Sequence, residues 1–312
     1  MIIIRVMGGL GNQMQQYALY KKLESLGRDV RLDISWFDQN CAQAAKPDVL
    51  MARDLELNAL QGLRYVPASK EEIRSVLGRL WEEPESFVQK IKKTFRPSQA
   101  SAFIESDMYH ENIFSYTEKY LVGYWACEKY YADILGTLRQ EIQFPVSEDL
   151  TLQKKNDDII RQMEETVSVS MHIRRGDYLD DANKPLFGNI CKDTYYASAI
   201  AFMKEKFGNV KFYLFSDDTA YAREHYQGDE YQVVDWNQGK NSFYDILLMS
   251  HCKHNICANS TFSFWGARLN AHEDKIMVRP SIHKNTQVCI PGQMKELWKG
   301  WTLITPQGEV LA

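Results

Sequence analysis

The sequence has no hydrophobic run long enough to cross a membrane. A membrane-spanning helix needs about 20 consecutive apolar residues, and no stretch of the 312-residue chain approaches that length. The opening segment, residues 1–6, is too short for a secretory signal peptide and reads as a first strand. We therefore expect a cytoplasmic protein. A lipid-linked binding partner would place it at the inner face of the membrane as a peripheral protein.

The sequence also has no excess of positive charge. It contains 37 Lys and Arg residues against 41 Asp and Glu residues, for a net charge of -4. Proteins that bind nucleic acid through its phosphates usually carry a clear basic surplus. This composition argues against nucleic acid as the main partner.

The cysteines lack the regular spacing of a disulfide framework or a zinc site. All six are scattered, so reduced thiols are expected. One group, His251, Cys252, His254 and Cys257, contains metal-ligand residue types close together. These residues straddle the end of a predicted helix and the start of a predicted strand, whereas zinc sites usually take two pairs of ligands across a loop. We expect no metal site.

The second half of the chain alternates short apolar strands with helical segments. Such alternation is typical of a parallel sheet covered by helices on both faces. The predicted strands are residues 167–174, 210–215, 231–235, 255–258 and 275–278, and the predicted helices lie near 193–206, 219–226, 242–251 and 261–270. In the first of these strands, apolar residues alternate with polar ones, which indicates one apolar and one polar face.

The first half begins with a strand, a glycine turn and a helix. Gly9 and Gly11 allow a ligand to approach the backbone closely, and Asp33 stands about where a dinucleotide fold holds its ribose-binding acid. Met14, however, occupies the place of the third glycine of that fingerprint. An NAD(P)-dependent oxidoreductase is therefore an alternative function. A non-catalytic sugar- or nucleotide-binding module is another, because Tyr and Trp are abundant.

The predicted fold is α/β, with two Rossmann-like domains that face each other across a cleft. We expect an N-terminal domain over residues 1–150, a C-terminal domain over 151–290 and a tail over 291–312 that packs back on the domains. The best linker candidate is the polar segment 145–157. Between the first strands and this linker, the predicted elements are helices at 55–60, 71–80, 86–93 and 130–140 and a strand at 120–125.

Polar residues gather at the ends of three predicted strands in the second half. Open α/β sheets bind ligands at the carboxyl ends of their strands, where a guanidinium can grip a phosphate with two hydrogen bonds and a helix start offers free N–H groups. These residues are His172, Arg174 and Asp177, then Asp217 and Asp218, and last Asn259, Ser260, Thr261, Phe262 and Ser263. They fit a nucleoside diphosphate, with the base near Asp217 or Asp218. The simpler alternative is that they cap helices and tie down a loop.

Four sequence blocks resemble the α-1,2-fucosyltransferases, particularly the bacterial ones. They are residues 8–14, 172–178, 215–218 and 252–267, in the same order as in that family and spanning nearly the whole chain. The resemblance implies a GT-B fold, GDP-fucose as donor, inversion at the sugar carbon and no metal. It also implies a glycan acceptor with a terminal β-galactose, of bacterial surface polysaccharide or O-antigen type, attacked through its 2-hydroxyl. Phe264 stands where a second tryptophan is expected.

The resemblance also suggests roles for individual residues. Arg174 is expected to contact the donor phosphate and His172 to line the guanine pocket. Arg175 has a weaker claim, because strand alternation turns it to the other face. Gly9, Gly11, Asn12 and Gln13 should contact the donor or the acceptor from the first domain.

The general base has more than one candidate. Asp177 is the first choice by position, and Asp180 and Asp181 on the same loop are its competitors. A loose transition state would leave little for any base to do.

Overall fold

The computed structural model describes residues 1–38, 54–78, 101–106 and 109–311. The helix expected at 86–93 lies outside these residues. The chain divides into two compact units, Met1–Gln143 and Phe144–Ala312. None of the helices in the described ranges is long and apolar enough to span a bilayer.

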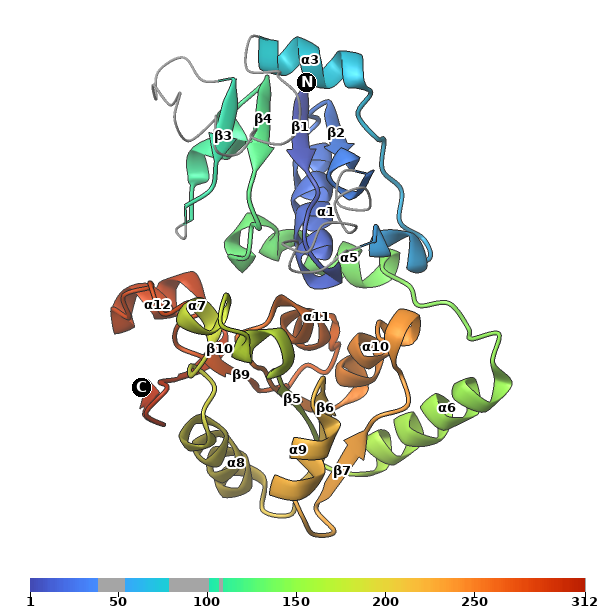
Figure 1. Ribbon diagram of the computed structural model, residues 1–312, viewed down its shortest axis with the longest axis vertical. Coiled ribbons are helices and arrows are strands. Elements are labelled where there is room, and N and C mark those ends of the chain that lie inside the picture. Colours follow the sequence, from blue (N-terminus) through green and yellow to red (C-terminus); the bar gives the residue numbers. More distant parts are fainter. Residues whose placement is uncertain (39–53, 79–100, 107–108, 312) are drawn as a thin grey trace. The chain divides into compact units, whose positions relative to one another are not determined.

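The first unit is built on a four-stranded parallel sheet (Figure 1). Its strand order is β2-β1-β4-β3, and helix α1 packs against β1 and β2. The bounds are β1 (Ile2–Arg5), α1 (Leu10–Ser25), β2 (Val30–Asp33), α3 (Lys70–Leu77), β3 (Ala102–Ile104), β4 (Lys119–Val122) and α5 (Leu135–Glu141), with short 3-10 turns that include η1 (Glu56–Ala59) and η4 (Glu111–Ser115). The expected helix at 55–60 is thus a 3-10 turn. All four strands run the same way, so their carboxyl ends meet at one edge.

The second unit is built on a seven-stranded sheet of order β11-β10-β9-β8-β5-β6-β7. Every neighbouring pair is parallel except β10 with β11. The strands are β5 (Ser168–Ile173), β6 (Lys211–Ser216), β7 (Tyr231–Val234), β8 (His254–Ile256), β9 (Met277–Pro280), β10 (Trp301–Ile304) and β11 (Val310–Leu311). The helices are α6 (Leu150–Glu165), α7 (Lys184–Phe187), α8 (Asp193–Phe207), α9 (Thr219–His225), α10 (Tyr244–His251), α11 (Thr261–Leu269) and α12 (Pro291–Leu297), with the 3-10 turn η7 (Gly176–Leu179).

The predicted α/β class is confirmed, because the first unit has a parallel sheet, the second has a sheet that is parallel except for β11, and helices connect the strands. The cleft between two facing domains stays a prediction. The chain after residue 290 adds α12, β10 and β11, and β10 pairs with β9, so this segment extends the second sheet.

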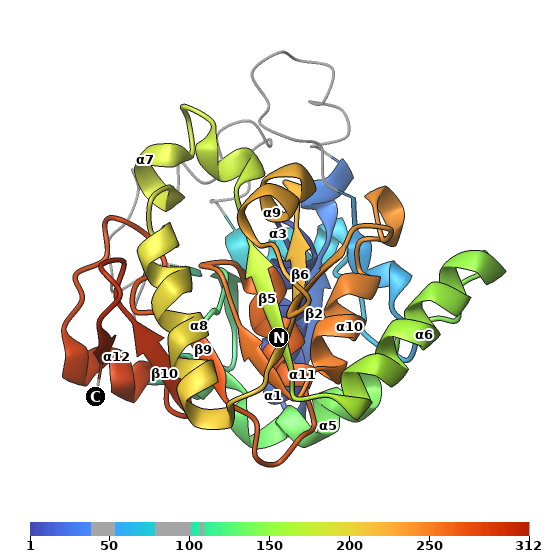
Figure 2. The same cartoon turned by 90° about the horizontal axis from the view of Figure 1, so that it is seen from below.

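Strand β5 is buried on both faces, as expected for a sheet covered by helices on both sides. Helix α8 lies on one side of β5, and α10 and α6 lie on the other (Figure 2). The apolar side chains of β5 join the core beneath α8, and Ser168 and Ser170 form hydrogen bonds on the other face. Asn255 Nδ2, for example, donates to Ser170 Oγ at 2.8 Å and to the carbonyl of Met249 at 2.7 Å. These bonds satisfy buried polar side chains, as is usual in a sheet covered on both faces.

The linker prediction was wrong over most of its length. Helix α6 begins at Leu150, and Asp149 caps it by accepting hydrogen bonds from the N–H groups of Thr151 and Leu152 at 2.9 and 3.1 Å. The helix buries Leu152, Ile159 and Met163 at helical spacing. Only the short segment 144–149 precedes it within the second unit.

Candidate functional site

The glycine turn after β1 is held in place by side chains of α1, the helix that follows it. Gly8 has φ +81°, and a side chain there would meet Asn12 Nδ2 at 2.5 Å, so glycine is required. Gln13 is fully buried; its Nε2 donates to the carbonyls of Gly8 and Asp54 at 2.9 and 3.0 Å, and its Oε1 accepts from Leu57 N at 3.1 Å. The side chain of Gln13 therefore fixes the turn and is committed to the backbone.

A second glutamine, which sequence reasoning missed, joins the turn to β4. Gln16 is fully buried, its Oε1 accepts from Met7 N at 3.0 Å, and its Nε2 donates to the carbonyl of Gly123 at 2.9 Å. Gly11 is buried, whereas Gly9 and Asn12 are partly exposed. Ligand contacts by Gly9 and Asn12 stay predictions.

Asp33 lies inside the first unit. Its Oδ2 accepts a hydrogen bond from Tyr120 and its Oδ1 accepts one from Ser35 N at 2.9 Å. Only 3% of the residue is exposed. A carboxylate in this position cannot hold the ribose of a dinucleotide, which removes the main support for the oxidoreductase alternative.

The second sheet brings the three predicted strand ends together. Strand β5 lies between β6 and β8, with His172 paired to Phe215 and Met171 paired to Ile256. All three strands are parallel, so the residues after Ile173, Ser216 and Ile256 share one edge. This edge is the carboxyl edge of the second sheet.

Arg174 is held by two carboxylates. Its Nη2 lies 2.5 Å from Asp177 Oδ1 and its Nη1 lies 2.9 Å from Asp217 Oδ2. Asp217 also accepts from Arg175 N at 2.9 Å. A side chain on Gly176 would meet Asp217 Oδ2 at 2.5 Å, so only glycine lets the turn pass this close to the carboxylate.

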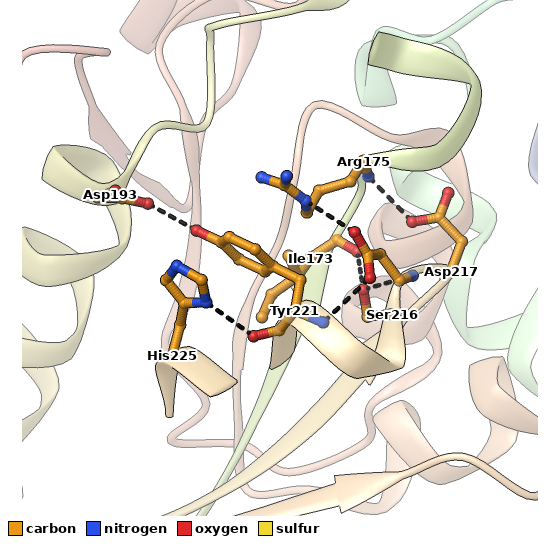
Figure 3. Close-up of polar contacts among 8 residues, drawn as sticks. Ile173, Arg175, Asp193, Ser216, Asp217, Tyr221 and His225 are labelled. Atoms are coloured by element: carbon orange, nitrogen blue, oxygen red, sulfur yellow. Dashed lines mark hydrogen bonds and ion pairs between the residues drawn. The ribbon is translucent and has the colours of Figure 1, made fainter. Parts of the chain in front are cut away.

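Arg175, the residue after Arg174, makes a different set of contacts (Figure 3). Its Nε lies 3.1 Å from Asp218 Oδ2, and its guanidinium lies 3.6 Å from the centroid of the Tyr221 ring. Asp218 also caps α9 by accepting from Tyr221 N at 3.0 Å, and this bond, followed by Arg175, lowers the pKa of Asp218. Within the described chain, the two Nη groups of Arg175 have no hydrogen-bonding or ionic partner.

His172 is a buried imidazole with an unused nitrogen. Its Nδ1 has no hydrogen-bond partner among the described residues, and its ring lies 5.8 Å from that of Phe262. Burial and then the charge of Arg174 lower the pKa of His172 to about 3. The ring is therefore neutral at physiological pH and can exchange a hydrogen bond with a ligand without carrying charge.

At the start of α11, the side chains of Asn259 and Ser263 form hydrogen bonds within the protein. Asn259 Nδ2 donates to the carbonyls of Phe187 and His283 at 3.1 and 3.2 Å, and Ser263 Oγ donates to the carbonyl of Ser260 at 3.1 Å. Asn259 and Ser263 thus shape the turn. The helix has no side-chain cap and no acid in its first turn, and the first N–H groups of an α-helix have no acceptor within the helix itself.

The charges at this edge do not sum to a positive site. Two guanidinium groups face three carboxylates, because Asp177, Asp217 and Asp218 all contact an arginine. An anion would therefore be bound by directed donors more than by net charge. Asp180 and Asp181 follow the turn η7 and are exposed.

The cysteine and histidine group near α10 is part of the packed sheet. His254 Nδ1 accepts from Ile276 N at 3.1 Å, and its ring stacks on Phe207. Burial raises the pKa values of the Cys252 and Cys257 thiols. In the part of the chain that the structure describes, no three His, Cys, Asp or Glu side chains are grouped to hold a metal ion.

Comparison with known proteins gives a consistent result. The family model described as glycosyl transferase family 11 matches residues 94–304. The chain is 30% identical to an α-1,2-colitosyltransferase of Escherichia coli, over 90% of this chain and 91% of that protein. It is 32% identical to the O-antigen biosynthesis glycosyltransferase WbnK of Escherichia coli, over 88% of this chain and 91% of that protein.

More distant similarities are also present. The galactoside α-(1,2)-fucosyltransferase 1 of Ateles belzebuth is 28% identical over 32% of this chain and 28% of its own length. The structure of the Escherichia coli ADP-heptose heptosyltransferase II is similar with a TM-score of 0.40 and 12% identity, over 97% of this chain and 89% of that one.

The family match extends over more than half of the chain and includes the whole carboxyl edge of the second sheet. The chain is an enzyme that transfers a glycosyl group, so the oxidoreductase and the non-catalytic binding module are both wrong as alternatives. It belongs to glycosyl transferase family 11, the family of the α-1,2-fucosyltransferases.

Proposed function

We propose that this enzyme transfers L-fucose from GDP-fucose to the 2-hydroxyl of a terminal β-galactose, with inversion. The acceptor is a glycan of the bacterial surface polysaccharide or O-antigen type. Family membership and the name of the O-antigen relative support this proposal. The observation that carries the donor site is the unused Nδ1 of buried His172, beside Arg174 and Arg175, at the carboxyl edge of the second sheet.

The contacts at this edge suggest how the donor binds. We place the guanine beside His172 and Phe262, because the neutral imidazole offers a hydrogen bond and the phenyl ring an apolar face. The diphosphate then lies by the start of α11 and the arginines. Asp217 and Asp218 hold the arginines in place in this arrangement, and they are no longer the first candidates for the guanine contact.

The same groups can stabilise the transition state. Breaking the bond between fucose and phosphate leaves extra negative charge on the departing GDP. Preorganised guanidinium and N–H donors stabilise such charge without reorganising during the reaction. Asp177 remains the first candidate for the base that accepts the proton of the acceptor hydroxyl, with Asp180 and Asp181 as alternatives.

A transfer assay tests the proposed function. Purified protein is incubated with GDP-fucose and a panel of terminal β-galactosides, with and without chelator, and the product linkage is determined by NMR. We expect release of GDP, a new α-1,2 linkage and no effect of chelator. Absence of transfer across the panel, or strict dependence on a divalent ion, would contradict the proposal.

The colitosyltransferase relative supports a second donor sugar. The same assay with a colitose donor in place of GDP-fucose separates the two. Faster transfer of colitose would leave the proposed donor site unchanged and would make colitose, not fucose, the transferred sugar.

A further inference from the structure

The turn after β4 carries one exposed aromatic ring between buried neighbours. Tyr124 is 41% exposed, whereas Val122 and Trp125 are 3% and 0% exposed. Strand β4 runs parallel to β1 and β3, so the turn lies at the carboxyl edge of the first sheet. Parallel sheets hold their ligands at this kind of edge, and Tyr124 presents a ring to solvent there.

Glu105, the residue after β3, fixes the backbone of this turn. Its Oε2 accepts hydrogen bonds from the N–H groups of Tyr124 and Trp125 at 2.8 and 2.6 Å. A side chain on Gly123 would meet Glu105 Oε2 at 2.7 Å, so only glycine lets the carboxylate come this close to the turn. Tyr124 therefore stands on a backbone with a defined position.

Trp125 adopts an unfavourable conformation next to the exposed ring. Its φ is +53°, in the left-handed region that a bulky side chain rarely enters. Its ring packs on Phe103 and Tyr130, with centroids 6.3 and 5.4 Å away, and its buried Nε1 has no hydrogen-bond partner in the part of the chain that the structure describes. Backbone strain of this kind gathers at functional sites. The inward ring of Trp125 leaves Tyr124 as the exposed ring of the turn.

Groups suited to hydroxyls lie at the same edge. His110 Nε2 lies 2.6 Å from the hydroxyl of Ser106, the residue after Glu105, and His110 N donates to the Tyr130 hydroxyl at 3.1 Å. Burial lowers the pKa of His110 from its usual 6.5, so its ring is neutral at physiological pH. A neutral imidazole and a hydroxyl can each donate and accept a hydrogen bond. The edge thus combines an aromatic ring with uncharged polar groups, the combination that a sugar ligand requires.

The shape of galactose matches an aromatic platform. Its 4-hydroxyl is axial and points to one face of the ring, which leaves H3, H4 and H5 as a continuous apolar patch on the other face. Such a patch can stack on the face of a tyrosine. The groups proposed for the donor all lie at the carboxyl edge of the second sheet, so a sugar site on the first sheet is left for the acceptor.

We infer that Tyr124 is the platform on which the terminal β-galactose of the acceptor stacks. Glu105 and Trp125 are positioning residues, because they hold the turn that presents the ring. This inference rests on the proposed function as a galactoside fucosyltransferase. It assigns the acceptor sugar to a named residue of the first unit, and it requires Tyr124 to act on the acceptor and not on the donor.

Steady-state kinetics of the full chain, with GDP-fucose and methyl β-galactoside varied in turn, test the inference. Tyr124→Ala should raise the KM for the galactoside about tenfold, which corresponds to about 1.4 kcal/mol, the size of one aromatic contact. The KM for GDP-fucose should stay as in the wild type. Tyr124→Phe keeps the ring and should have a galactoside KM close to that of the wild type.

Saturation-transfer NMR with methyl β-galactoside reports on the stacked face directly. In the wild type and in Tyr124→Phe, saturation should be strongest at H3, H4 and H5. In Tyr124→Ala this pattern should be lost.

Tyr116→Ala is the matched control. Tyr116 is a partly exposed ring that precedes β4, at the opposite edge of the same sheet, where Lys119 lies 4.8 Å from its centroid. Its removal should leave the KM for the galactoside unchanged.

The outcomes separate the platform from the proposed function. If the wild type fucosylates β-galactosides and folded Tyr124→Ala keeps the wild-type galactoside KM, or if the KM values for both substrates rise in equal proportion, the platform is overturned and the function stands. If Tyr124→Ala does not fold, wild-type saturation that is not strongest at H3, H4 and H5 overturns the platform by itself. If the wild type fucosylates no β-galactoside, the proposed function fails and the inference fails with it.

Discussion

The carboxyl edges of the two sheets differ in what their polar groups do. At the first edge, the side chains of Gln13, Gln16 and Asp33 are bonded to the protein itself. At the second, His172 Nδ1 and the Nη groups of Arg175 have no partner in the described ranges. Both edges follow the same strand–turn–helix pattern. The difference shows that a glycine turn before a helix can serve the fold alone, and the unpaired polar groups are the reason why we propose the ligand site at the second edge.

The largest expected effect is that of Arg174→Ala. The substitution leaves Asp177 and Asp217 without their counter-ion and turns their charge toward the diphosphate. We expect kcat/KM for GDP-fucose to fall by about 100- to 1000-fold, measured in the transfer assay. Arg161→Ala, on an exposed turn of α6 where Arg161 pairs with Asp158, is the control and should have full activity. Full activity of the Arg174 variant would remove the second edge from the mechanism.

Gln16→Leu tests the comparison at the first edge. It removes two buried hydrogen bonds and leaves Met7 N and the carbonyl of Gly123 unsatisfied. We expect the first unit to lose roughly 2–3 kcal/mol of stability, measured by denaturant unfolding, with GDP affinity retained. Gln162→Leu, at an exposed position of α6, is the control. A selective loss of GDP affinity without a loss of stability would show that the first edge binds the donor.

His172 should give the protein a pH-dependent stability. Its pKa is about 3 in the folded chain, against an ordinary histidine value of 6.5, so the unfolded chain takes up the proton first. Stability is therefore complete above pH 6.5 and falls as the pH decreases towards 3. The loss is about 2 kcal/mol between pH 7 and pH 5. Unfolding curves of His172→Phe should be flatter over this range, and an equal slope in both proteins would contradict the buried neutral ring.

The smallest expected effect is that of Gly176→Ala. The new side chain would meet Asp217 Oδ2 at 2.5 Å and push the carboxylate away from Arg174. We expect kcat/KM to fall about tenfold, the effect of roughly 1.4 kcal/mol, with little change in melting temperature. Gly136→Ala in α5, where a side chain would have no atom within 4 Å, is the matched control. Unchanged kcat/KM in Gly176→Ala would show that activity does not require the contact between Asp217 and Arg174.

The sequence predicted the second sheet well because each of its strands is a short apolar run between helices. One edge was predicted to hold His172, Arg174, Asp217 and Ser260, because strands that alternate with helices form a parallel sheet whose carboxyl ends meet. The pairing of Arg174 with Asp217 was not predicted, because it depends on the register of β5 against β6, with Ile173 opposite Ser216. That register depends on how the hydrophobic faces of both strands meet the same core, which the sequence of one strand does not show by itself.

The other differences have similar physical causes. Helix α1 is buried on most sides, so its glutamines carry no amphipathic pattern that would mark them as structural. The segment taken for a linker contains a cap at Asp149 and apolar residues at helical spacing, signals that its polar composition outweighed. Tyr221 lies three residues after Asp218, the spacing of a helix cap, but its stack on Arg175 depends on the turn after β5.

Hydrogen–deuterium exchange with and without GDP tests the central contrast most directly, because it reports on both edges in one experiment. We predict that GDP protects residues 172–178, 216–221 and 260–264, and leaves exchange at residues 7–16 unchanged. Protection of residues 7–16 with no change at 172–178 would contradict the assignment of the donor to the second sheet.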